Sequence, residues 1–183
     1  MGWAQFRDMN VRRIESIAPE RWRNGGGITR AIASNGDDWR VSIAEVERDG
    51  PYSRFDGIAR ISLVLRGDGV VLRDGDDVVM LRPFEAVEYD GDANWSATLI
   101  GARVTVLNVM TCVGVCRARV QAIVHPVTVG PGCAAIVVAL DGACLCNDIA
   151  IGTGDVAVIE NVIKPMRLEG TRGTPFLVTI ERA

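Results

Sequence analysis

Two arginine–serine pairs, Arg40-x-Ser42 and Arg60-x-Ser62, have the spacing most indicative of chemistry in this chain. Each pair lies in a short run rich in Val and Ile, at residues 39–46 and 58–65. Because alternate residues of a strand share a face, each arginine would lie on the same face as its serine. A guanidinium fork beside a hydroxyl suits a carboxylate. The pairs predict an anion site if this face points inward, and a solvated surface if it points outward.

A glycine-rich segment, Trp22-Arg23-Asn24-Gly25-Gly26-Gly27-Ile28-Thr29, is the second candidate. Three consecutive glycines allow unusual φ angles and let backbone N–H groups approach a ligand closely. A phosphate-binding loop would continue with Lys and then Ser or Thr, and would open a helix. Both features are missing, so nucleotide binding is not supported. A flexible turn is the alternative interpretation.

Metal and nucleophilic chemistry are poorly supported. The chain has a single histidine, His125, whereas a histidine-based metal site needs two or three. Cys144 and Cys146 are too close in sequence for a usual zinc knuckle, and their apolar neighbours favour buried packing. The five cysteines show no disulfide framework. We therefore expect no metal and no cofactor.

Composition excludes two classes of partner. The 183 residues include 20 Lys and Arg against 23 Asp and Glu, a net charge of −3. Without a basic excess, a nucleic-acid partner is not expected. No apolar stretch reaches the length of about 18 residues that a membrane span needs. The first residues also lack the apolar core of a secretory signal, so we expect a cytoplasmic protein.

Short apolar runs separated by Gly, Asp, Asn or Pro predict an all-β fold. The runs lie at residues 39–46, 58–65, 78–81, 104–110, 134–140, 156–159 and 176–180. The Asp74-Gly75 and Asp141-Gly142 pairs predict hairpins. Residues 18–24 look like a short helical piece that begins at Pro19.

The two halves of the chain share a rhythm. In each half a strand ends near Gly, a return strand follows, and Gly-Asp or a similar turn precedes the next strand. This rhythm is typical of a cupin jelly roll, and two copies indicate a bicupin, that is, two jelly-roll-like β-barrels. A single irregular sandwich is the alternative. We expect an N-terminal barrel with the pocket at residues 1–112 and a C-terminal cupin-like barrel at 113–183, with an exchange of strands between them left open.

The quoted motifs resemble the HutD/Ves family. The resemblance rests on the segment 22–29, on Trp39-Arg40-Val41-Ser42-Ile43-Ala44, on Gly50-Pro51-Tyr52-Ser53-x-Phe55-x-Gly57-Ile58-x-Arg60, on Leu65-x-Gly67-x-Gly69 and on Asn108-Val109-Met110. It implies a bicupin fold, a link to histidine utilisation, and binding of a small pathway intermediate such as N-formylglutamate. Cupin sheets often pair across their edges, which is compatible with a homodimer.

Comparison with metal-binding cupins strengthens the inward orientation of Arg60. If the last glycine of their metal motif is Gly67, the glutamate ligand position is Arg60 and the histidine positions are Phe55 and Ser53. An always-protonated guanidinium cannot ligate a metal, so the interior becomes an anion site. One departure is Val106, which stands where the family usually has Asp.

Our first hypothesis is a metal-free binding protein for a small carboxylate, with a regulatory role. Arg60 would form the charged fork, and the other ligand-binding residues would be Trp22, Asn24, Thr29, Ser42, Phe55, Ser62 and Asn108. The alternative is a metal-independent enzyme acting on a small organic acid, with a general base from Glu45, Asp56 or Glu88. A scaffold whose interior is packed shut is the third interpretation. The C-terminal half has no Arg-x-Ser analogue and is expected to be structural.

Overall fold

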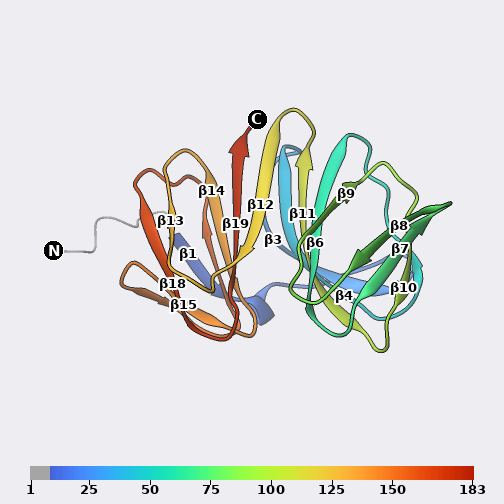
Figure 1. Cartoon of the computed structure of the whole chain (residues 1–183), viewed down its shortest axis with the longest axis horizontal. Helices are drawn as coiled ribbons and strands as arrows, with labels where there is room; N and C mark the ends of the chain where they lie inside the picture. The colour runs from blue at the N-terminus through green and yellow to red at the C-terminus, as the bar shows by residue number, and fades with distance from the viewer. Residues whose placement is uncertain (1–8) are drawn as a thin grey trace. The chain divides into compact units, whose positions relative to one another are not determined.

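The computed structural model describes residues 9–183, whose regular secondary structure is almost entirely β-strand, as predicted (Figure 1). One short 3-10 helix, η1 (Ile14–Ser16), is the exception in this range. The strands form four sheets, which fall into two compact units. We call residues 17–117 the N-unit, and residues 118–182 together with 9–16 the C-unit. No helical segment of the described chain could cross a lipid bilayer.

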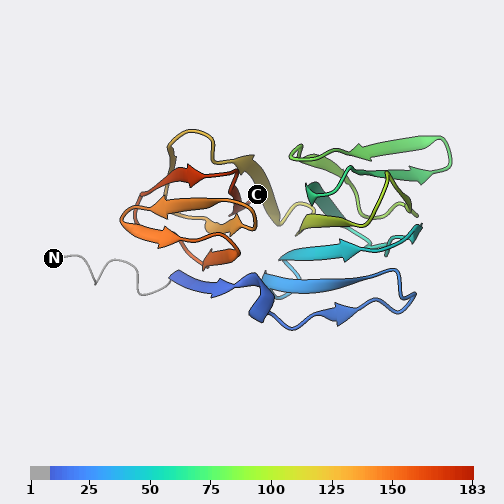
Figure 2. The same cartoon turned by 90° about the horizontal axis from the view of Figure 1, so that it is seen from below.

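The N-unit consists of a six-stranded and a four-stranded antiparallel sheet. Figure 2 shows the hairpin of β7 and β8 (green) on the opposite side of this unit from β2 and β3 (blue). The larger sheet has the order β2 (Glu20–Arg21), β3 (Gly27–Asn35), β4 (Trp39–Val46), β11 (Val104–Cys112), β6 (Ile58–Arg66) and β9 (Val87–Asp90). The smaller has the order β5 (Gly50–Pro51), β10 (Ser96–Leu99), β7 (Val70–Asp74) and β8 (Asp77–Leu81).

The C-unit consists of a five-stranded and a four-stranded sheet. The first has the order β1 (Met9–Arg13), β17 (Asp155–Ile159), β14 (Ala134–Ala139), β19 (Phe176–Arg182) and β12 (Cys116–Ala122). The second has the order β13 (Val127–Val129), β18 (Met166–Arg172), β15 (Ala143–Cys146) and β16 (Ile149–Ile151).

An eight-strand pattern occurs in both units. The order β4-β11-β6-β9 in the N-unit matches β12-β19-β14-β17 in the C-unit, and β5-β10-β7-β8 matches β13-β18-β15-β16. The N-unit adds β2 and β3 beside β4, and the C-unit adds β1 beside β17. The units divide at 16/17 and at 117/118. The sequence predicted a division at 112/113 and left an exchange of strands between the barrels open.

The additional strand β1 is fixed by a regular ladder, from Met9 opposite Ile159 to Arg13 opposite Asp155. The Arg13 guanidinium donates to the Thr153 carbonyl oxygen at 2.7 Å and pairs with the Asp155 carboxylate at 3.2 Å. These contacts place the first described strand in the same unit as the last one.

Two local predictions were wrong. Residues 18–24 contain the short strand β2 instead of a helix, because the Trp22 N–H pairs with the Gly27 carbonyl oxygen across the loop at 3.0 Å. Asp141-Gly142 joins two different sheets instead of forming a hairpin. Its glycine is needed for close packing, since a Cβ atom there would lie 2.6 Å from the Pro175 nitrogen. The predicted hairpin at Asp74-Gly75 is confirmed by the pairing of β7 with β8.

Candidate functional site

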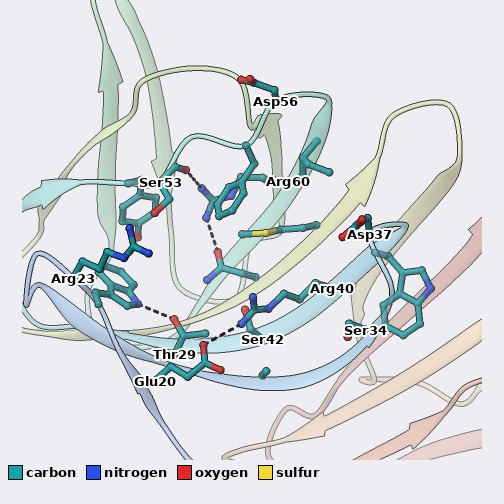
Figure 3. A pocket seen from close by; sticks show the side chains of 18 of the residues that line it. Glu20, Arg23, Thr29, Ser34, Asp37, Arg40, Ser42, Ser53, Asp56 and Arg60 are labelled. Atoms are coloured by element: carbon teal, nitrogen blue, oxygen red, sulfur yellow. Dashed lines mark hydrogen bonds and ion pairs between the residues drawn. The ribbon is translucent and has the colours of Figure 1, made fainter.

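A pocket of about 1050 Å³ lies within the N-unit (Figure 3). Its wall is built from β2, β3, β4, β6 and β11 and from the segment that follows β5. The lining residues used below are Glu20, Trp22, Asn24, Thr29, Arg40, Ser42, Tyr52, Ser53, Phe55, Asp56, Arg60, Asn108 and Met110.

Strand β11 lies between β4 and β6, and its register aligns the two Arg-x-Ser pairs. Met110 is opposite Arg40 on one side and opposite Arg60 on the other. Asn108 is opposite Ser42 and Ser62 in the same way. The pairs therefore form two adjacent rows across three strands. Arg60 is only 4% exposed, so the inward orientation predicted for it is confirmed and the solvated alternative is wrong.

Arg60 is a buried cation with sparse hydrogen bonding. Its Nη1 donates to the Ser53 carbonyl oxygen and its Nη2 to the Asn108 Oδ1, both at 3.4 Å. The buried Nε has no partner. Among residues 9–183 no carboxylate pairs with this guanidinium. A buried charge is costly without a partner, so the site favours an anion.

Three aromatic rings surround the Arg60 guanidinium. The guanidinium carbon lies 5.3 Å from the ring centres of Tyr52 and Tyr89 and 5.7 Å from that of Phe55. Such contacts partly offset the cost of burying the cation. Burial raises the pKa of Tyr52 far above its usual value, and nearby Tyr89 raises it further, while Arg60 lowers it. Tyr52 therefore stays a neutral phenol and supplies no counter-charge.

A hydrogen-bond relay fixes the amide of Asn108. The Ser62 hydroxyl donates to the Asn108 Oδ1 at 2.6 Å, and the Tyr89 hydroxyl lies 2.9 Å from the Ser62 Oγ. Since the serine has one hydrogen, Tyr89 donates to Ser62. The Asn108 oxygen thus accepts from both Ser62 and Arg60, which leaves the amide nitrogen as a free donor in the pocket wall.

The glycine-rich segment closes one side of the pocket through its own internal bonds. The Gly26 N–H donates to the Asn24 Oδ1 at 2.9 Å, and the Gly25 N–H donates to the Trp22 carbonyl oxygen at the same distance. The Trp22 indole N–H donates to the Thr29 hydroxyl at 2.8 Å. The predicted approach of these glycine amides to a ligand is therefore wrong for Gly25 and Gly26, because both amides are used within the loop.

Seven of the eight predicted ligand-binding residues line this pocket, namely Trp22, Asn24, Thr29, Ser42, Phe55, Arg60 and Asn108. Ser62 lies behind the wall and contacts Asn108 instead. Tyr52 and Tyr89, the two tyrosines whose rings surround the Arg60 guanidinium, were not identified from the sequence. Tyr52 belongs to the Gly50-Pro51-Tyr52-Ser53 motif and could have been found there. No motif or spacing in the sequence marked Tyr89.

The three candidate general bases are poorly placed. Glu45 pairs with Arg30 at 2.6 Å, and neither Glu45 nor Glu88 lines the pocket. Asp56 lines the pocket but is exposed and pairs with Arg54 at 2.8 Å. Figure 3 shows Asp56 on the outer loop, pointing away from Arg60.

Val106, which stands where the HutD/Ves pattern usually has Asp, lies in the apolar core of the N-unit. Val106 is fully buried, opposite Ala44 and Val64 on the flanking strands. It belongs to the apolar cluster that fills this part of the unit. In residues 9–183 no group of three His, Cys, Asp or Glu side chains is arranged to hold a metal ion.

The interior of the C-unit is filled by apolar side chains. Cys144, Cys146 and Met166 are buried in its core, and the Cys146 thiol lies 3.8 Å from the Met166 sulfur. Burial raises the pKa of Cys144 to about 11, and neighbouring Cys146 adds to the shift. Burial also raises the pKa of Cys146. Both cysteines are free thiols that act as small apolar groups, as predicted.

Comparison with known sequences gives a consistent family match. The chain matches the HutD family over residues 14–174. It is 38% identical over 107 residues to an uncharacterized 21.2 kDa protein in the hutC 3' region of Pseudomonas putida, covering 55% of this chain and 56% of that protein. It is 33% identical over 116 residues to protein Ves of Citrobacter koseri, covering 59% and 60%. The chain thus spans somewhat over half the length of these relatives.

Solved structures match over nearly the whole chain. HutD from Pseudomonas fluorescens SBW25 superposes with a TM-score of 0.83 at 23% identity, covering 96% of this chain and 99% of that one. A cupin 2 conserved barrel domain protein from Leptotrichia buccalis has a TM-score of 0.61 at 12% identity, covering 95% and 96%. At these identities the matches establish a cupin-like all-β fold.

Proposed function

This chain belongs to the HutD family, as its resemblance to HutD/Ves sequences predicted, and we propose that it is a binding protein for a small carboxylate. The ligand would occupy the pocket of the N-unit. One of its carboxylates would face the guanidinium of Arg60 and the free amide nitrogen of Asn108.

The observation that carries the proposal is the missing counter-charge of Arg60. This guanidinium is buried and makes only two long hydrogen bonds. The surrounding tyrosine and phenylalanine rings are neutral, so the pocket retains a net positive centre. A carboxylate would supply both the missing charge and better acceptors. Such a pocket needs only a few fixed polar groups in a largely apolar wall.

The ligand we propose is an intermediate such as N-formylglutamate. The relative from the hutC 3' region supports a link to histidine utilisation. A regulatory role would follow if occupancy of the pocket changed a contact with another protein. The repeated eight-strand order supports the finer fold assignment, a bicupin with one barrel per unit.

Calorimetric titration of wild type and of Arg60→Gln with N-formylglutamate, glutamate and urocanate tests the proposal. Losing the charged partner from a buried site costs about 2–5 kcal/mol, which is enough to abolish micromolar binding. Arg54→Gln is the matched control, because Arg54 lies on the same loop as Phe55 but outside the pocket lining.

Binding by wild type and Arg54→Gln, but not by Arg60→Gln, would support the proposal. Equal binding by all three proteins would remove Arg60 from the site. Absence of binding by wild type would exclude these ligands.

A further inference from the structure

A second arginine, Arg40, lies in the same row as Arg60. Both residues flank Met110 on neighbouring strands, so two strand spacings, about 10 Å, separate their Cα atoms. Both side chains line the pocket. Because each arginine stands on a strand in the interior of the six-stranded sheet, the distance between the two attachment points is fixed.

Arg40 has a weak partner that a ligand could replace. Its Nη2 lies 3.7 Å from the Glu20 Oε2, and the two side chains are 43% and 73% exposed. An exposed pair at this distance contributes little to stability. Figure 3 shows Arg40 extending toward Glu20, on the other side of the pocket from Ser53 and Arg60.

The wall between the two arginines suits the body of a short ligand. Met110 offers an apolar surface in the first row, and the Asn108 amide nitrogen offers a donor in the second. Thr29 and Ser42 add hydroxyl groups on the Arg40 side.

We infer that Arg40 determines specificity by holding the second carboxylate of the ligand, an inference that rests on the proposed carboxylate-binding function. One carboxylate is held at Arg60, as proposed above. The second is held at Arg40, where it displaces the Glu20 carboxylate. Glu20 therefore competes with the second carboxylate of the ligand for Arg40. It lowers the affinity for a dicarboxylate more than the affinity for a monocarboxylate.

The test compares N-formylglutamate with its two monoamides, in which one carboxylate or the other is replaced by an uncharged amide. Titrations use wild type, Arg40→Gln, Glu20→Gln and the Arg54→Gln control. We expect wild type to bind N-formylglutamate about tenfold more tightly than the better monoamide. Arg40→Gln should abolish this preference without weakening the better monoamide. Glu20→Gln should increase the preference.

Two results would overturn the inference and leave the proposed function standing. One is equal affinity of wild type for N-formylglutamate and the better monoamide. The other is an equal loss of both ligands in Arg40→Gln. If wild type bound none of the three compounds, the proposed ligand would fail together with the inference. Thermal unfolding of each variant checks that Arg40 and Glu20, both exposed in part, are not needed for folding.

Discussion

The N-unit and the C-unit share a strand order and each has an apolar core, but only the N-unit also buries a row of polar side chains. Inward positions of the central strand β6 are Arg60, Ser62 and Val64, whereas those of the matching strand β14 are Ala135, Val137 and Ala139. Asn108 on β11 has a polar role that no core residue of β19 repeats, since Leu177 packs there. The fold therefore forms without any buried polar row. The polar row of the N-unit is therefore not a requirement of this strand order.

The strongest way to break this comparison is to place a charge in the filled interior. Val137 is fully buried in the C-unit core, so Val137→Arg buries a cation without an acceptor. We expect it to lower the free energy of unfolding by at least about 4 kcal/mol, or to prevent folding. Urea unfolding measures the change, with Val137→Met as the uncharged control. A similar loss for both variants would show that only volume matters there.

The reciprocal change removes the charge from the N-unit. Arg60→Met should leave the free energy of unfolding unchanged or raise it by up to about 1 kcal/mol, since an unpaired buried charge is replaced by an apolar chain. The lost contacts with Tyr52 and Tyr89 limit the gain. If Arg60→Met lowered the free energy of unfolding as much as Val137→Arg, the Arg60 cation would stabilise the N-unit without a ligand. That result would contradict the difference drawn between the two units.

The dependence of stability on pH tests how completely the core of the C-unit excludes water. The folded C-unit raises the pKa of Cys144 from 9.0 to about 11, so the folded state keeps a proton that the unfolded chain releases. Stability is therefore full below pH 9 and falls as the pH rises toward 11, by up to about 2 kcal/mol. Unfolding of wild type and Cys144→Ala at pH 8, 10 and 11 measures the difference. If the stability of wild type and of Cys144→Ala changed equally with pH, the Cys144 thiol would not be excluded from water.

A smaller effect than that of Cys144 is expected for the hydrogen-bond relay in the N-unit. Ser62→Ala leaves the Tyr89 hydroxyl without its acceptor and removes one donor to Asn108, which should cost about 1 kcal/mol. Because Tyr89 and Ser62 act through one hydrogen bond, the double variant with Tyr89→Phe should cost less than the sum of the single variants. Thermal unfolding of the four proteins measures the coupling. Strict additivity would show that the two groups act independently.

Much of the fold was predictable from local patterns. The run at 39–46 coincides with β4, and the runs at 58–65 and 104–110 match β6 and β11 within two residues. These strands are long and rich in Val and Ile, so their pattern is strong. The position of β1 could not be predicted, because its pairing with β17 spans nearly the whole chain. Asp141-Gly142 misled because its glycine serves close packing against Pro175.

The site was predictable where one strand face carried it. Arg40, Ser42 and Arg60 alternate with apolar residues, so their shared face follows from strand geometry alone. Which residues of β4 and β6 lie opposite each other depends on the register of both strands with β11, and no local sequence pattern specifies that register. Tyr89 enters the site from β9, and only its pairing opposite Arg60 brings it there.

The location of β1 also has a consequence for biosynthesis. Residues 9–13 are synthesised well before their partners on β17, which follow about 140–150 residues later, so this ladder has a very large sequence separation. The N-unit can complete all its ladders in the meantime, since every one of its strands lies within residues 17–117. During synthesis the strands of the N-unit are therefore complete before β17 is made, and the C-unit pairs β1 only after that.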